Sequence, residues 1–194
     1  RLRRRAGAAR VAVGGDVGFH LRRLPGMRNA SAKVGPGGGG GGPGFPEARA
    51  RFYAACVVLA LEHVHALGFL HRDVKPENLM LEASGYCLLG DFGLGYALGS
   101  DGRCRHRSCT PRYAAPEIHA GDGAHGCAFD FFSLGATLLE LLTGRPPPWH
   151  DTERPPLPAP AYPDGAVSAE ARAAVAALTA VDPGARPATG AAAR

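Results

Sequence analysis

The segment His71–Asn78, which reads HRDVKPEN, constrains this chain more than any other stretch. It places a carboxylate (Asp73), an ammonium group (Lys75) and a carboxamide (Asn78) within six residues. Because Pro76 prevents the segment from continuing as a regular helix, we expect a loop. An acid that orients a hydroxyl, a lysine beside a phosphate and an asparagine oxygen on Mg²⁺ are the groups that suit phosphoryl transfer.

A second acidic motif follows at Asp91-Phe92-Gly93. Residues 79–81 and 86–89 read as two short strands, joined by a turn through Ser84-Gly85. Such a hairpin would hold Asn78 and Asp91 at adjacent ends. The sequence therefore predicts a metal site with one ligand on each side.

Three motifs in this order resemble the protein kinases: HRDVKPEN at 71–78, DFG at 91–93 and APE at 115–117. Lys75 within the first motif resembles the serine/threonine-specific branch. The longer sequence around these motifs is similar to that of the cyclic-nucleotide-dependent kinases of the AGC type, and most of all to that of the cGMP-dependent kinases. For any one of these residues alone, the alternative is a solvated loop charge.

The resemblance implies an ATP-dependent protein serine/threonine kinase that uses Mg²⁺. By this resemblance Asp73 orients the substrate hydroxyl, Lys75 stabilises the moving phosphate, and Thr110 bonds to both of these side chains. Asn78 and Asp91 would bind the metal and, together with Lys75, the nucleotide.

Two further acids complete the site that the resemblance implies. Asp16 follows Gly14-Gly15, at the position where the family begins the helix after the hinge; its carboxylate would meet the ATP ribose and a basic substrate side chain. Glu77 is assigned to the same nucleotide and substrate site. The expected partner is thus a protein whose serine or threonine follows arginines.

Structural roles follow from the resemblance for four residues. Asp130 lies in an apolar stretch, where an ionised carboxylate is costly unless it is hydrogen-bonded. By resemblance it binds the backbone of the 71–73 turn; the alternative is an ordinary acid near a helix start. Glu117 and Arg186 are predicted to form a buried ion pair. Arg72 grips a phosphothreonine in the family, but His106 occupies that position here, so we expect Arg72 to lack this partner.

The predicted fold is mostly α, a kinase-like C-terminal lobe with a short β-hairpin. Residues 1–34 form a basic lead and hinge-like segment, 35–44 a glycine-rich linker insertion, and 45–190 the lobe. We expect helices from Pro46 to Gly68, from Cys127 to Thr143 and from Ser168 to Pro183. Spacings of three and four assign one face of the first helix to Phe52, Cys56, Leu59, His63 and Ala66, and the inner face of the last to Ala174, Leu178 and Val181.

The charge of +5 is unevenly distributed, because residues 1–33 contain nine of the 22 basic residues and one acid. The lead has no aromatic residue before Phe19 to stack on bases, so we predict a disordered segment and no nucleic-acid binding, with an organelle transit peptide as an alternative. Five cysteines without metal-ligand spacing predict reduced thiols and a cytoplasmic location. No apolar run approaches the roughly 20 residues of a membrane span.

One departure from the family pattern concerns the nucleotide. The only lysines are Lys33 and Lys75, and neither stands where the family has its phosphate-anchoring strand lysine. We therefore expect the N-terminal lobe to be largely absent and the chain to be a fragment. The alternative to an enzyme is a pseudokinase-like or truncated binding module that keeps the fold without turnover. The sequence does not indicate an oligomeric state.

Overall fold

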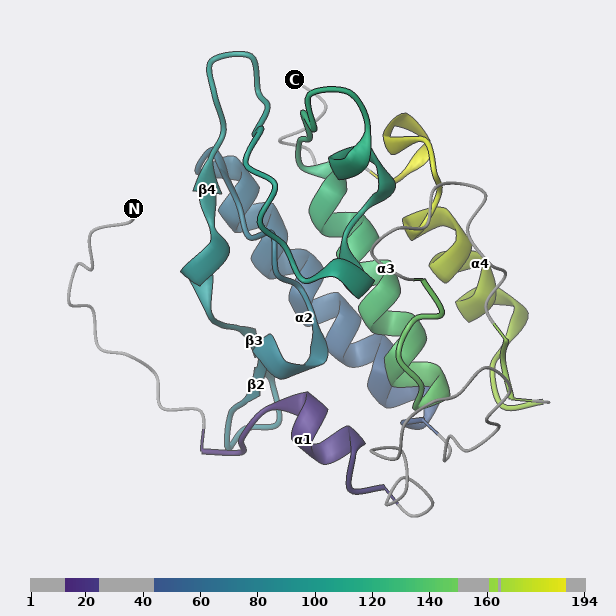
Figure 1. The fold of residues 1–194 in the computed structure, drawn as a ribbon. Helices are drawn as coiled ribbons and strands as arrows, with labels where there is room; N and C mark the ends of the chain where they lie inside the picture. Colours follow the sequence, from purple (N-terminus) through teal and green to yellow (C-terminus); the bar gives the residue numbers. More distant parts are fainter. Residues whose placement is uncertain (1–12, 25–43, 150–160, 164, 188–194) are drawn as a thin grey trace.

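The computed structural model describes residues 13–24, 44–149, 161–163 and 165–187. The basic lead up to residue 12 and the glycine run at 37–42 lie outside these ranges. Figure 1 shows a mostly helical molecule with two small antiparallel sheets, which confirms the predicted fold class. The helices are α1 (Val17–Leu21), α2 (Glu47–Ala66), α3 (Ala128–Thr143) and α4 (Ala169–Leu178), and the strands are β1 (Phe69–Leu70), β2 (Leu79–Leu81), β3 (Cys87–Leu89) and β4 (Tyr96–Ala97).

Helix α3 forms the centre of the fold and lies between α2 and α4 (Figure 1). Every residue from Phe129 to Thr143 is buried, so this helix has no solvent face. Gly135 allows α4 to approach closely, since a Cβ there would lie 2.7 Å from Leu178 Cβ. The helix ends at Gly144, whose left-handed φ of 66° would strain any residue with a side chain. Polar groups on α3 must therefore find partners inside the protein.

Helix α2 has the predicted bounds, but it packs through a different face. The predicted residues share a face that is mostly the outer one, since Phe52 is 43% and Leu59 is 67% exposed. The face that packs on the core is displaced from the predicted face by about one residue along the sequence. Because α2 carries apolar side chains almost all round, both registers satisfy helical spacing, and burial against α3 and the hairpin selects one. The packed face consists of Ala50, Tyr53, Val57, Leu61 and Val64.

Helix α4 begins as predicted, with the Ser168 hydroxyl accepting the Ala171 N–H at 3.1 Å. Its predicted inner face is wrong in two positions. Ala174 is exposed while Val175 is buried, and Val181 lies beyond the end of the helix with 43% exposure. The helix is rich in alanine, so spacing alone does not set the register, and the larger Val175 and Leu178 decide which side packs on α3.

The predicted hairpin is present. Strand β2 pairs with β3 in antiparallel register, with Leu79 opposite Leu89. Strand β1 pairs with β4, a contact that the sequence did not predict because each strand has only two residues. Helix α1 is joined to the hairpin by the pair of backbone bonds from Gly14 N to Leu81 O (3.0 Å) and from Leu81 N to Gly15 O (2.9 Å). This junction places Asp16 beside the 71–78 loop.

In the part of the chain that the structure describes, no helix is long and apolar enough to cross a bilayer. None of the five cysteines, all of which are described, forms a disulfide.

Candidate active site

Three of the predicted catalytic side chains, those of Lys75, Asn78 and Thr110, contact the carboxylate of a fourth, Asp73. Lys75 Nζ donates to Asp73 Oδ2 at 2.8 Å and to Thr110 Oγ1 at 2.8 Å. Asn78 Nδ2 donates to Asp73 Oδ2 at 2.8 Å and to the Asp73 carbonyl at 2.7 Å. The Thr110 hydroxyl donates to the remaining oxygen, Asp73 Oδ1. Residues 73, 75, 78 and 110 therefore form one connected polar cluster.

The protonation state of Asp73 follows from these contacts. Burial alone would raise its pKa, but the hydrogen bonds from Lys75, Thr110 and Asn78 favour the charged form and lower the pKa below its ordinary value. Asp73 is thus an ionised carboxylate at neutral pH. Such a group orients a hydroxyl by accepting its hydrogen bond, and it is a weak base.

Asp130 connects this loop to the central helix. Its carboxylate accepts the backbone N–H of His71 at 2.9 Å and that of Arg72 at 2.7 Å, which confirms the predicted contact. It also bonds His65 Nε2 at 2.7 Å. Because Asp130 is fully buried on α3, the position of the 71–73 turn is fixed by the helix core.

His65, near the end of α2, carries the positive charge that neutralises the Asp130 carboxylate. Burial would lower the pKa of His65, but its hydrogen bond to Asp130 and the attraction of the Asp130 charge, with a further contribution from the nearby Cys127 side chain, outweigh burial and raise it to about 9. The two residues therefore form a buried ion pair below that pH. This role could not be predicted from the sequence, because the pairing of a histidine on one helix with a lone acid on another has no signature in spacing.

Arg72 is 2% exposed and has a left-handed backbone with φ of 68°. Its guanidinium donates to the carbonyls of Leu94 (3.1 Å), Ser108 (2.5 Å) and His106. Its Nε donates to His125 Nε2 at 3.3 Å. Burial lowers the pKa of His125, so the neutral ring accepts this bond. Arg72, which we expected to lack a phosphothreonine partner, is thus bonded by uncharged acceptors instead.

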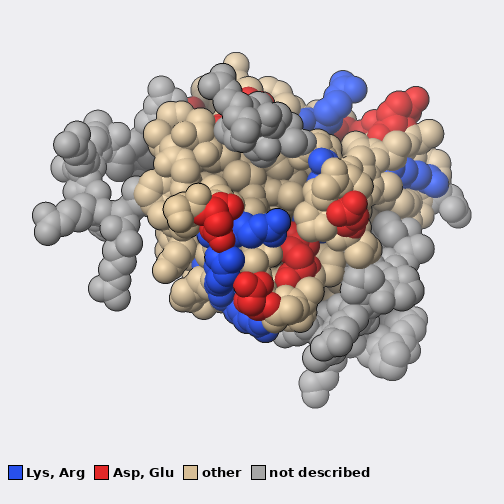
Figure 2. All heavy atoms as spheres, turned by 90° about the horizontal axis from the view of Figure 1, so that it is seen from above, with Lys and Arg blue, Asp and Glu red and all other residues tan. Residues whose placement is uncertain are grey.

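The segment that contains these carbonyls is further fixed by exposed ion pairs. Arg105 contacts Asp101 at 2.8 Å and Asp122 at 2.9 Å. Arg107 Nη2 donates to the Gly121 carbonyl at 2.7 Å. On the face seen in Figure 2, acidic and basic side chains lie beside one another rather than in broad patches of one sign.

Asp91 lies at the end of the hairpin next to Asn78. Gly90 N donates to the Asn78 carbonyl at 2.8 Å, and the His71 ring bonds the Gly90 carbonyl at 2.9 Å. Asp91 has a left-handed φ of 54°, and its carboxylate accepts Gly93 N at 3.1 Å. Its side chain is exposed and makes no direct bond to the Asp73 cluster. Backbone contacts of the neighbouring Gly90 thus place Asp91 beside the cluster.

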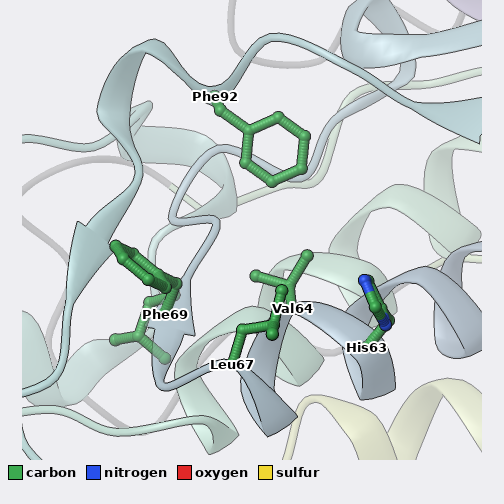
Figure 3. A pocket seen from close by; sticks show the side chains of 6 residues that line it. His63, Val64, Leu67, Phe69 and Phe92 are labelled. Carbon is green, nitrogen blue, oxygen red and sulfur yellow. The ribbon is translucent and has the colours of Figure 1, made fainter. Parts of the chain in front are cut away.

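An apolar pocket of about 300 Å³ is lined by His63, Val64, Leu67, Phe69, Leu70 and Phe92. Figure 3 shows Phe92 facing Val64, Leu67 and His63 across it, with Phe69 at one side. None of the candidate catalytic side chains lines this cavity, so it is not the site of phosphate chemistry.

The two predicted substrate acids are linked through a residue that the sequence did not single out. Arg22 Nη1 donates to Glu77 Oε1 at 2.8 Å, and Arg22 Nη2 lies 3.8 Å from Asp16 Oδ1. Asp16 also caps α1, since its Oδ1 accepts the Phe19 N–H at 2.6 Å. Asp16 and Glu77 therefore flank one guanidinium.

A third acid, Glu140 on α3, is bonded by the Tyr113 hydroxyl. Burial raises the pKa of Glu140 to about 7. The signal in the sequence was present, because Glu140 and Asp130 are the only charged residues in α3. Asp130 was identified and Glu140 was not.

The predicted pair of Glu117 and Arg186 is confirmed. Arg186 Nη1 and Nη2 donate to the two Glu117 oxygens at 2.7 and 2.8 Å. The Arg186 side chain is fully buried and Glu117 is 13% exposed. Arg186 also donates to the carbonyls of Ala128, Ala180 and Val181, so it joins the start of α3 to the chain beyond α4.

The comparisons with known proteins agree with this geometry. A family model described as "Protein kinase domain" matches residues 41–190. The chain is 45% identical to human Rho-associated protein kinase 1 over 112 residues, which are 55% of this chain and 8% of that protein. It is 39% identical to protein kinase 2 of Dictyostelium discoideum over 134 residues, 69% of this chain and 24% of that protein.

Human cGMP-dependent protein kinase 2 is 46% identical over 103 residues, which are 53% of this chain and 13% of that protein. The matches thus span a small part of the length of these relatives. They confirm the predicted likeness to AGC-type kinases. The chain belongs to the protein kinase domain family.

Proposed function

We propose that this chain transfers the γ-phosphate of ATP to serine or threonine hydroxyls of proteins. The observation that carries the proposal is the Asp73 carboxylate, which receives hydrogen bonds from Lys75, Asn78 and Thr110 at once. Family membership supports protein kinase chemistry, and the cluster supplies the groups for it.

Each residue of the cluster has a distinct part in the proposed reaction. Asp73 accepts the hydrogen bond of the substrate hydroxyl and directs its oxygen towards the phosphate. Lys75, bonded to Asp73 and Thr110, carries the positive charge that favours the transferred phosphate. Thr110 ties the segment that presents the substrate to the catalytic loop.

Asn78 and Asp91 would hold Mg²⁺. Both Asn78 contacts use its amide nitrogen as donor, so its oxygen suits a cation, and Asp91 is an exposed carboxylate on the adjacent chain. When bound, the metal supplies positive charge for the phosphate oxygens of ATP. The described residues contain no cluster of three or more His, Cys, Asp or Glu placed for a metal, so the ATP phosphates would complete the shell.

The proposed substrates carry arginines before the phosphorylated residue. Asp16 and Glu77 support this preference because they already flank a guanidinium, that of Arg22. Asp16 and Glu77 would also contact the nucleotide, as their positions in the family motif imply. The proposed setting is the cytoplasm, as predicted from the cysteines.

The test is transfer of radiolabelled phosphate from ATP and Mg²⁺ to an arginine-containing serine peptide. Asp73→Asn should lose about 10²- to 10⁴-fold in rate. Asp182→Asn makes the same chemical change on an exposed loop and should leave the rate intact. Equal signals from the wild type and Asp73→Asn would remove the mechanism. Peptide or nucleotide binding without any transfer would favour the binding module over the enzyme.

A further inference from the structure

We propose that Arg22 is an internal competitor for substrate arginines, and that a substrate arginine binds Asp16 and Glu77 by displacing the Arg22 guanidinium. The inference rests on the proposed function, because it concerns the same acidic pair. It assigns to Arg22 a part in specificity.

The geometry places one guanidinium between two carboxylates. Arg22 lies directly after α1, and its two terminal nitrogens face different acids, with 2.8 Å to Glu77 Oε1 and 3.8 Å to Asp16 Oδ1. This is the arrangement in which an incoming arginine would be bound. The chain therefore already shows which side chain the pair accepts.

Gly18 provides the space for this arrangement. A Cβ at Gly18 would lie 3.2 Å from Arg22 Nη1 and 3.2 Å from Asp16 Oδ1, which is tighter than an ordinary contact. A side chain here would push on both groups. The absence of one leaves room for a guanidinium beside the helix.

The contact of Arg22 with the two acids can also be replaced by that of another guanidinium. The side chains of Arg22, Glu77 and Asp16 are 53%, 40% and 31% exposed, so water and solutes reach all three. Exposed ion pairs contribute little to stability. Moreover, α1 is held by bonds that do not involve the Arg22 side chain, namely the Asp16 cap and the backbone junction of Gly14 and Gly15 with Leu81. Loss of the Arg22 contact would therefore leave Asp16 and helix α1 in place.

Arg23 offers a matched control. It is the next residue and carries the same charge, but its guanidinium lies 3.8 Å over the Phe19 ring. No bond from Arg23 to either acid is present in the described structure. A change that depends on net charge alone should appear in both arginine variants, whereas competition should appear only at Arg22.

The experiment measures binding, so it does not depend on turnover. A fluorescent peptide with two arginines before a serine is titrated with the full chain, and anisotropy gives Kd; a second peptide has glutamines in place of the arginines. Arg22→Gln should bind the arginine peptide roughly two- to fivefold more tightly, the range expected for displacing an exposed ion pair. Arg23→Gln should leave Kd unchanged. Adding Glu77→Gln to Arg22→Gln should abolish the gain.

Several results would overturn the inference. Unchanged or weaker binding by Arg22→Gln would mean that Arg22 is neutral or positions the acids. An equal gain for Arg23→Gln or for the glutamine peptide would point to net charge, and absence of binding by either protein would remove the arginine site. Phosphate transfer to the glutamine peptide is scored separately, so the proposed kinase activity can stand when this inference fails.

Discussion

Arg186 places both terminal nitrogens on the two oxygens of Glu117, at 2.7 and 2.8 Å, with the arginine side chain fully buried. Glu117→Ala would leave a buried guanidinium without its carboxylate, and the remaining carbonyl partners do not neutralise it. We expect a loss of roughly 3–5 kcal/mol in the free energy of unfolding. Urea denaturation followed by circular dichroism measures it.

The matched control is an ion pair on the surface. Asp101→Ala removes one carboxylate partner of Arg105, a pair that is about half exposed on each side. Its unfolding midpoint should change far less than that of Glu117→Ala. Similar midpoints for the two variants would contradict the structural role of Arg186.

Thr110 should affect the ionisation of Asp73. The Thr110 hydroxyl donates to Asp73 and accepts from Lys75, so Thr110→Val removes a hydrogen bond that favours the charged carboxylate. The pKa of Asp73 should rise, and the acidic limb of the pH–rate profile for phosphate transfer should move to higher pH. Removing a bond to a charged group should cost about 10- to 100-fold in rate.

Thr110→Ser keeps the hydroxyl and should restore most of the rate and the position of the acidic limb. If valine and serine behaved alike, the hydroxyl would have no part in setting the state of Asp73.

Stability should fall as the pH rises through the titration of His65. Its pKa is raised from 6.5 to about 9 in the folded protein, so the folded state retains a proton that the unfolded state loses between these values. The contribution is fully present below pH 6.5 and is lost as pH rises through about 9, amounting to roughly 3 kcal/mol at most.

Urea denaturation at intervals between pH 6 and 10 measures this dependence. His65→Gln should be less stable than the wild type at pH 6 and should show a flatter curve over the same range. A wild-type curve that rises between pH 6.5 and 9 would show that the His65–Asp130 pair is not charged.

Glu140 should also cause a loss of stability as the pH rises, over a lower pH range than that of His65. Because burial raises its pKa to about 7 from 4.5, the folded protein binds a proton that the unfolded chain has released. Its contribution is present below pH 4.5 and is lost as pH rises through 7. Glu140→Gln should flatten the stability curve between pH 4.5 and 7.

Tyr113→Phe should raise the pKa of Glu140 further. It removes the hydroxyl that donates to the Glu140 carboxylate, so the pKa of Glu140 should rise and the loss should occur at higher pH. An unchanged curve in this variant would mean that the hydroxyl does not favour the charged form.

The catalytic loop was predictable because its chemistry is local in sequence. Asp73, Lys75 and Asn78 lie within six residues, and a proline limits the conformations between them. The hairpin that carries Asn78 towards Asp91 was predictable for the same reason, with short strands and a glycine turn. Roles in metal, nucleotide and substrate binding remain predictions.

Contacts between distant segments were predictable only where the family resemblance supplied them, as for Glu117 with Arg186. His65 with Asp130, and Tyr113 with Glu140, depend on how α2 and the 110–113 turn pack on α3. The predicted residues of α2 do share one face, but spacing could not show which face packs on the core, for the same physical reason. Helical spacing admits two registers when apolar residues surround a helix, and only the neighbouring elements choose between them.

The guanidinium of Arg72 takes three of its four partners from main-chain oxygens. Every amino acid has a carbonyl oxygen, so these contacts do not specify which side chains stand at positions 94, 106 and 108. Mutation can therefore change those side chains while Arg72 keeps its hydrogen bonds to the backbone, provided that the path of the backbone is preserved.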